Sequence, residues 1–143
     1  MLVYKTKIQN LINWLDEYDV NIKEIDEQHK RLAEIINDFY QAFQTNKDEK
    51  SLCKILDDLL AETVLHFREE EAIMEFHGYP DYALHKEEHD ILSKEVTNMF
   101  KGNIKGERNK SEKIGFFLKE WLMNHIVEED KNLGKFLTTK GAT

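Results

Sequence analysis

Cysteine, proline and glycine are scarce in this chain of 143 residues, and each shortage excludes a class of protein. A single cysteine, Cys53, rules out an internal disulfide framework and a thiolate-rich zinc site. One proline and six glycines leave room for long, uninterrupted helices. No apolar run approaches the roughly 20 residues of a membrane-spanning helix, and the start shows no signal-peptide core. We therefore expect a cytoplasmic, helical protein.

Positive charge is also in short supply, since 20 Lys and Arg residues stand against 28 Asp and Glu residues, a net charge of −8. Such a surface repels phosphate backbones and anionic lipids, so we expect neither a nucleic-acid partner nor membrane binding. The composition, 41% hydrophobic and 34% charged, is ordinary for a globular protein. The length suits a single domain that covers residues 1–143.

Hydrophobic residues recur with helical periodicity in four stretches. In the first, the apolar positions from Ile22 to Phe43 are spaced 3, 4, 3, 4, 3, 4, which predicts a helix buried along one face. Gly78 and Pro80 close the second stretch, and Ser111 is a candidate N-cap for the fourth. The expected elements are an N-terminal arm over about residues 1–20 and helices over about 21–44, 51–77, 81–101 and 111–134. Because short connections force sequential helices to run antiparallel, the predicted fold is all-α, an antiparallel up-down-up-down four-helix bundle.

Most of the histidines occupy positions on the apolar stripes of these helices, where leucine would be expected. They are His29, His66, His85, His89 and His125. Burying an imidazole without a partner costs about 1–3 kcal/mol, and each predicted helix supplies at least one. His66 and Glu70, like His85 and His89, are four residues apart and point the same way on their helices. In an antiparallel bundle the heights of the five histidines converge on one layer, where a metal centre would satisfy them all.

The number of candidate ligands indicates two metal ions. Zinc takes about four ligands, and the candidates here are more numerous: five histidines, Glu70 and an acid after His125. Their nitrogen and oxygen donors also suit iron, manganese or copper. Two metals bridged by two carboxylates and one oxygen, with the histidines divided three and two, would leave one metal an open position. The acid after His125 stays undecided on geometry: Glu129 fits a regular helix slightly better, and Asp130 would need a π-bulge.

Four blocks of residues follow one another at set separations. They are Trp14 with Tyr18-Asp19-Val20 and Ile25-Asp26-Glu27-Gln28-His29; His66-Phe67-x-x-Glu70; Tyr79-Pro80 with His85-x-x-x-His89; and Trp121-Leu122-x-x-His125-Ile126-x-x-x-Asp130. Together, from Trp14 to about Leu137, they resemble the hemerythrin family, in particular its single-domain bacterial type. One departure is Asn21, where many members have glycine, and asparagine tolerates the left-handed conformation that glycine adopts.

The resemblance implies a non-haem di-iron site. One iron would be held by His85, His89 and His125 and the other by His29 and His66, with Glu70 and Asp130 bridging both beside an oxo or hydroxo group. The family's His-x-x-x-x-Asp spacing selects Asp130. The implied apolar O2 pocket consists of Leu32, Phe67, Trp121, Leu122 and Ile126. The implied function is reversible O2 binding for storage, delivery or sensing rather than catalysis, with O2 held as hydroperoxide on the five-coordinate iron and NO or azide as alternative ligands.

Two other functions compete with O2 binding. His89-Asp90 resembles the doublet of helical metal phosphohydrolases, although this interpretation leaves His29 and His66 unexplained. A carboxylate di-iron oxidase of the ferritin-like class uses Glu-x-x-His pairs, and no histidine in this chain has a glutamate three residues before it.

The remaining polar residues near these motifs have plainer predictions. Glu69, Glu71, Glu87 and Glu88 are expected to be solvated, His77 is expected not to be a ligand, and Cys53 is expected to be a small packing residue.

Overall fold

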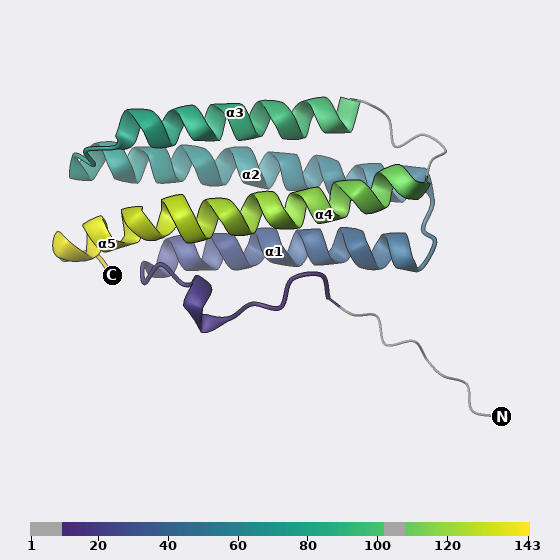
Figure 1. Cartoon of the computed structure of the whole chain (residues 1–143), viewed down its shortest axis with the longest axis horizontal. Helices are drawn as coiled ribbons and strands as arrows, with labels where there is room; N and C mark the ends of the chain where they lie inside the picture. Colours follow the sequence, from purple (N-terminus) through teal and green to yellow (C-terminus); the bar gives the residue numbers. More distant parts are fainter. Residues whose placement is uncertain (1–9, 102–107) are drawn as a thin grey trace.

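The computed structural model describes residues 10–101 and 108–143, and these form helices without any β-strand. The elements are η1 (Asp16–Tyr18), α1 (Lys23–Gln44), α2 (Glu49–His77), α3 (Tyr82–Lys101), α4 (Arg108–His125), η2 (Ile126–Asp130) and α5 (Lys131–Thr139). The four long helices lie side by side and alternate in direction (Figure 1). α1 packs against α2 and α4, and α3 closes the ring against the same two helices. The predicted all-α, up-down-up-down bundle is confirmed.

Local chemistry determines where α2 begins and ends. The Asp48 carboxylate accepts a hydrogen bond from the backbone N–H of Ser51 (2.8 Å), so α2 begins at Glu49 rather than near residue 51. At the other end Gly78 adopts the left-handed conformation (φ 64°) and stops the helix, as predicted. The helix is therefore defined by a cap at each end.

The fourth helix differs from expectation at both ends. α4 begins at Arg108, so Ser111 lies within the helix and is not its N-cap. The residues between Arg108 and Ser111 include no glycine or proline, so nothing in the sequence prevents the helix from beginning before Ser111. Beyond His125 the chain passes through η2, a π-helical turn, into α5, which continues in the same direction (Figure 1). The expected end near residue 134 is too early, because α5 continues to Thr139 and Leu137, beyond the expected end, is fully buried.

The described part of the N-terminal arm packs along α1, and residues 1–9 of the expected arm lie outside the described residues. The Ile12 backbone N–H donates to Asn37 Oδ1, and Asn37 Nδ2 donates to the Ile12 carbonyl, both at 2.8 Å. Asn21 has φ 67°, the left-handed conformation expected for it. Asp26 of α1 accepts hydrogen bonds from the backbone N–H groups of Val20 and Asn21 (2.7 and 3.1 Å). These contacts attach the arm to the helix that carries His29.

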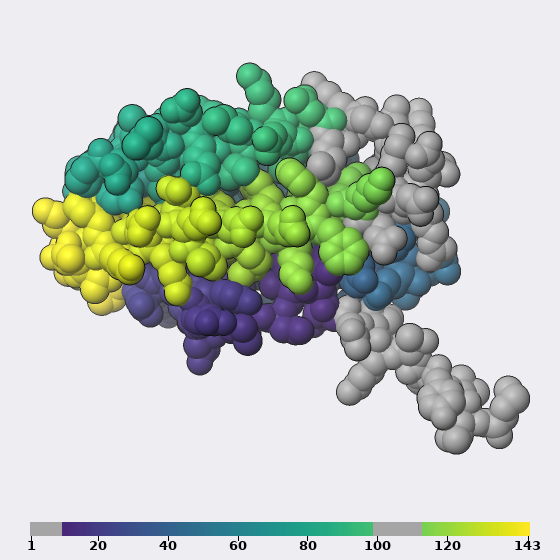
Figure 2. Space-filling view, viewed as in Figure 1, coloured from purple at the N-terminus to yellow at the C-terminus, as the bar shows by residue number. Residues whose placement is uncertain are grey.

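The C-terminal residue meets the start of α1 at one end of the bundle. The backbone N–H of Lys23 donates to the carbonyl of Thr143 (3.2 Å). Gly134 of α5 lies so close to Val20 that a Cβ on Gly134 would sit 2.4 Å from the Val20 carbonyl oxygen. In the space-filling view, α4 and α5 run between α3 and the N-terminal part of the chain (Figure 2). Of the helices in the described ranges, none combines the length and the apolar character that a membrane-spanning segment requires.

Candidate metal centre

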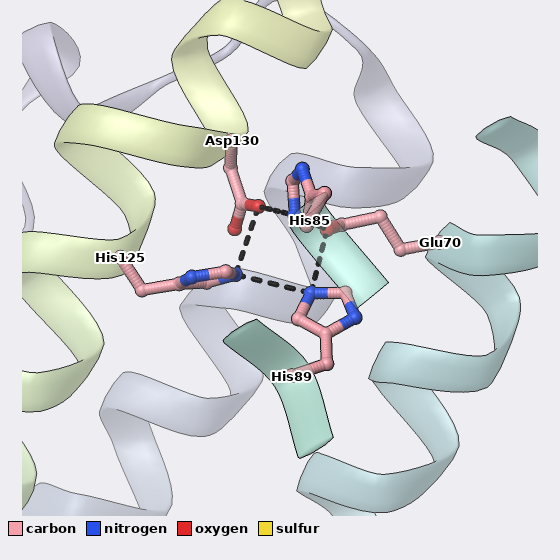
Figure 3. A group of neighbouring side chains, drawn as sticks. All are labelled: Glu70, His85, His89, His125 and Asp130. Carbon is pink, nitrogen blue, oxygen red and sulfur yellow. Dashed lines mark hydrogen bonds and ion pairs between the residues drawn. The ribbon is translucent and has the colours of Figure 1, made fainter. Parts of the chain in front are cut away.

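Each of the four long helices sends polar side chains into the middle of the bundle. His29 comes from α1, His66 and Glu70 from α2, His85 and His89 from α3, His125 from α4 and Asp130 from η2. All seven are buried, none more than 3% exposed. Their donor atoms form two overlapping groups: Glu70, His85, His89, His125 and Asp130 in one, and His29, His66, Glu70 and Asp130 in the other. Figure 3 shows the first group, whose side chains point toward one another.

Glu70 contributes one carboxylate oxygen to each group. Its Oε1 lies 2.7 Å from His85 Nε2 and 3.1 Å from His89 Nε2. Its Oε2 faces the other way and lies 3.2 Å from His66 Nε2 and 3.9 Å from His29 Nε2. The two oxygens therefore serve different sets of imidazoles.

Asp130 is divided in the same manner. Its Oδ1 lies 3.0 Å from the Nε2 atoms of both His85 and His125 (Figure 3). Its Oδ2 lies 2.8 Å from His29 Nε2. Two carboxylates that each face both groups have the geometry of bridging ligands between two metal ions.

The π-helical turn η2 brings Asp130 into this cluster. On a regular α-helix a residue at i+5 is rotated by about 140° from its partner, so Asp130 would point away from His125. The wider turn of η2 corrects this rotation, and Asp130 is fully buried. Glu129 is only half-buried and contacts Glu88 instead. The acid that reaches the cluster is thus Asp130, not the Glu129 that a regular helix slightly favours.

Many donor atoms in the cluster lack hydrogen bonds although they are buried. Among the described residues, His66 Nε2, both nitrogens of His29 and His85, and both oxygens of Glu70 and Asp130 have no hydrogen-bonding partner. The Nε2 atoms and the carboxylate oxygens among them lie 2.7–3.9 Å from one another in pairs. Buried polar atoms are normally satisfied, so a shared ligand is the ordinary explanation for so many exceptions in one place. Imidazole nitrogens and carboxylate oxygens suit iron and similar divalent metals, and the residues present therefore fit a metal pair.

The charges in the cluster support ionised carboxylates. Burial raises the pKa of the Asp130 carboxyl, but the charges of His125 and His29 and their close contacts outweigh it and hold this pKa well below its ordinary value. Burial and the charge of Asp130 raise the pKa of Glu70, yet His66 and His85 bring it below its ordinary range. Both carboxylates are therefore charged and available to cations near neutral pH.

The histidines experience the opposite effect. Burial lowers the pKa of His85, but its contacts with Asp130 and Glu70 raise it overall, to about 9. The pKa values of His66 and His125 are likewise raised, because the same two carboxylates outweigh burial. Protons and metal ions therefore compete for the same imidazole nitrogens.

A second layer of residues contacts the outer nitrogens of three histidines. The Nδ1 of His66 lies 2.6 Å from Gln28 Oε1. Glu71 Oε2 is 3.0 Å from His89 Nδ1, and Glu88 Oε1 is 3.0 Å from His125 Nδ1. Such contacts orient a metal-binding imidazole and set which nitrogen carries the proton.

Glu69, Glu71 and Glu88 are half-buried and make contacts that the prediction of solvated side chains did not include, whereas Glu87 is exposed as predicted. Glu69 accepts a hydrogen bond from Gln28 Nε2, and the other two contact histidines. Each contact crosses from one helix to another, so helical periodicity alone does not reveal it. A search for an acceptor behind each candidate ligand would have considered these acids.

The five residues of the expected O2 pocket all belong to one buried apolar cluster. They are Leu32, Phe67, Trp121, Leu122 and Ile126, each at most 6% exposed. The Phe67 ring stacks on the His89 ring, with centroids 3.9 Å apart and planes 6° from parallel. Phe67 also meets the His125 ring edge-on at 5.7 Å. The polar cluster is therefore bordered by apolar side chains on this side.

Three other residues singled out in the sequence lie outside the cluster. Asp90 is exposed and pairs with Lys86 (3.2 Å), so the His89-Asp90 doublet does not converge on one site. His77 is in the last turn of α2, where its Nδ1 donates to the carbonyl of Ile73 (3.0 Å). Cys53 is half-buried and packs against the main apolar cluster.

Comparisons with known proteins agree with this geometry. The family model "Hemerythrin HHE cation binding domain" matches residues 20–137. Bacteriohemerythrin of Methylococcus capsulatus is 33% identical over 129 residues, which cover 90% of this chain and 98% of that protein. Bacteriohemerythrin of Stenotrophomonas maltophilia is 32% identical over 121 residues, covering 85% and 78%. A crystal structure of wild-type hemerythrin superposes with a TM-score of 0.77 at 32% identity, covering 89% of this chain and 98% of that one. The chain is therefore a member of the hemerythrin family, and it carries a buried His/Glu/Asp cluster of the metal-binding kind.

Proposed function

We propose that this protein binds O2 reversibly at a pair of iron ions and is not an enzyme. In this proposal His85, His89 and His125 would hold one iron and His29 and His66 the other, with Glu70 and Asp130 as ligands shared by both beside an oxo or hydroxo group. O2 is the physiological ligand, and NO and azide are alternatives. We also propose that residues 1–143 form a single domain.

The observation that carries the proposal is the division of the two carboxylates. Each of Glu70 and Asp130 turns one oxygen to the group with three histidines and the other oxygen to the group with two. With the bridging ligands shared, the group of two histidines has one protein ligand fewer. That difference supports an open coordination position at the two-histidine iron, suited to one small ligand.

The bound ferrous ions would supply the electrons and the open coordination position that O2 binding requires. The chain supplies the surroundings. Five neutral imidazoles contribute no negative charge to the pair, which favours reversible binding over O–O cleavage. Leu32, Phe67, Trp121, Leu122 and Ile126 would keep water and protons away from the bound ligand and so slow its loss.

The competing functions have weaker support in the geometry. A phosphohydrolase would need Asp90 beside His89 at the metal, but Asp90 pairs with Lys86 at the surface. A carboxylate di-iron oxidase relies on a carboxylate-rich ligand set, whereas this cluster contains five histidines and two carboxylates.

The test is metal analysis of the purified protein combined with visible spectra under anaerobic, oxygenated and azide-treated conditions. We expect about two iron ions per chain, as the two donor groups require, and charge-transfer bands that appear with O2 and disappear when it is removed. Azide should produce a distinct spectrum. Protein that binds no iron pair, or whose spectrum does not respond reversibly to O2, would contradict the proposal.

A further inference from the structure

The acceptors behind the histidines differ between the two halves of the candidate centre. His89 and His125, in the three-histidine group, each face a carboxylate, from Glu71 and Glu88. His66, in the two-histidine group, faces the amide oxygen of Gln28. The remaining two histidines, His29 and His85, have no hydrogen-bonding partner at Nδ1 among the described residues, one in each group. The two-histidine group therefore has one neutral acceptor, and the three-histidine group has two charged acceptors.

Glu69 determines which end of the Gln28 amide faces His66. A carboxylate only accepts hydrogen bonds, so the Gln28 Nε2 that it contacts must donate to Glu69. The other end of the amide, Oε1, is then left for His66, and because a carbonyl oxygen also only accepts, His66 Nδ1 must carry the proton. The Nε2 of neutral His66 consequently keeps a free lone pair, directed toward Glu70 Oε2 at 3.2 Å.

Hydrogen bonds to charged acceptors are about twice as strong as those to neutral ones, and they make an imidazole a more basic metal ligand. Access from solvent does not separate the two halves. A hollow of about 240 Å³ between α1 and α2 includes Gln28 and His66 in its wall, and a hollow of about 220 Å³ between α3 and α4 includes Glu88 and His125. Apart from the number of histidines, the acceptors are therefore the feature that distinguishes the halves.

We propose that Gln28, oriented by Glu69, is a positioning residue that presents His66 Nε2 to metal, and that its neutral amide makes the two-histidine half the more weakly binding half of the centre. This inference rests on the proposed function, because it requires a metal pair. It concerns how strongly each half binds, which the proposed function leaves open.

The experiment is an anaerobic titration of the full chain with ferrous iron against a competing chelator, performed on the unmodified protein and on variants. The unmodified protein should show one tighter and one weaker ion. Gln28→Leu should weaken the second ion by about 10–100-fold, the usual effect of losing an outer partner, and leave the first unchanged. Glu69→Gln should act in the same direction, because a glutamine no longer dictates the orientation of the Gln28 amide.

Two further variants separate positioning from a general structural role. Glu62→Gln removes the same charge from the wall of the same hollow and should change neither ion. The double variant Gln28→Glu with Glu69→Gln exchanges the two side chains. The carboxylate at position 28 then accepts a hydrogen bond from His66, and the amide at position 69 donates a hydrogen bond to that carboxylate. The double variant should restore binding of the second ion to at least its original strength and lower the reduction potential of that iron.

The outcomes distinguish the two proposals. If the unmodified protein binds no pair of iron ions, the proposed function fails and this inference fails with it. If it binds a pair but Gln28→Leu leaves both affinities unchanged, or the exchanged pair does not restore binding lost in the single variants, only the role of Gln28 and Glu69 is overturned.

Discussion

His125 and Asp130 are five residues apart along the chain, yet their side chains meet, with His125 Nε2 3.0 Å from Asp130 Oδ1. The π-helical turn between them makes this contact possible. A π turn contains one residue more than an α turn, and such turns recur where a helix must redirect a functional side chain. Here it turns Asp130 inward and leaves Glu129 half-buried beside Glu88.

Replacing Asp130 with alanine should remove most of the bound iron, because its two oxygens face both halves of the centre. The loss should exceed the about 10–100-fold weakening that follows removal of an outer-layer partner. Glu129→Ala is the matched control, since it deletes the neighbouring acid of the same turn, and it should leave iron content nearly intact. Iron analysis and the oxygenated spectrum measure both. Survival of the spectrum in Asp130→Ala would show that this residue is not a bridge.

Replacing Phe67 with alanine should destabilise the fold and shorten the life of the oxygenated form. Removing a buried ring that stacks on His89 leaves a cavity, with a cost of about 3–5 kcal/mol in the free energy of unfolding. The same cavity would admit water. Urea denaturation of chelator-treated protein measures the first effect, and the decay of the oxygenated spectrum in air measures the second.

Phe76 provides the control for this change, because it lies on the same helix and is 85% exposed. Phe76→Ala should alter the free energy of unfolding by no more than about 0.5 kcal/mol and should not affect the oxygenated spectrum. Equal effects at the two positions would mean that the Phe67 ring has no special role beside the cluster.

Replacing Gly134 with alanine should destabilise the protein by about 1–3 kcal/mol, because the new Cβ would lie 2.4 Å from the Val20 carbonyl oxygen and force α5 away from the arm. Gly115→Ala is the contrasting variant. Its Cβ would meet the Phe39 ring at an ordinary 3.7 Å, and a helix interior favours alanine by about 0.5–1 kcal/mol. Thermal unfolding of both should give midpoints that move in opposite directions. A Gly134→Ala midpoint at or above that of the unmodified protein would refute the close packing.

Protein stripped of metal with a chelator should lose stability as the pH rises through about 9. The pKa of His85 is raised in the folded chain to about 9, from an ordinary value of 6.5. Its stabilising contribution is therefore fully present below pH 6.5 and disappears as the pH passes through 9. The shift corresponds to about 3 kcal/mol. Unfolding free energies of stripped protein between pH 6 and pH 10 test this, and His85→Gln should make the decline shallower without abolishing it, because the pKa values of His66 and His125 are raised as well. A profile that is already flat without the substitution would contradict the raised pKa.

The fold could be predicted because its determinants are local. Apolar positions at helical spacing define four buried stripes, and residues such as Gly78 mark where a stripe ends. The same stripes placed His29, His66 and the other histidines in the core without any knowledge of their partners. A residue pattern of this kind indicates which face of a helix is buried. The pattern therefore predicted the cluster, because the histidines of the cluster all lie on buried faces.

Other features depend on how neighbouring helices are aligned, which periodicity does not record. Glu88 lies on α3 but contacts His125 on α4, and Gln28 on α1 contacts His66 on α2. On a single helix these residues resemble ordinary surface positions. The choice between Glu129 and Asp130 was undecided for a related reason: a π turn has no strong sequence pattern, and resemblance to a family was needed to choose Asp130.

All four long helices contribute side chains to the buried cluster, and this has a consequence for the persistence of the protein. Donor atoms from four helices come together only in the folded chain, so a metal pair would bind the folded form and not the unfolded one. By mass action, ligand at 100 times its dissociation constant adds about 2.7 kcal/mol to folding stability. Under the proposed function, the amount of intact protein would follow the iron supply, and loss of iron would leave a larger unfolded fraction open to proteolysis.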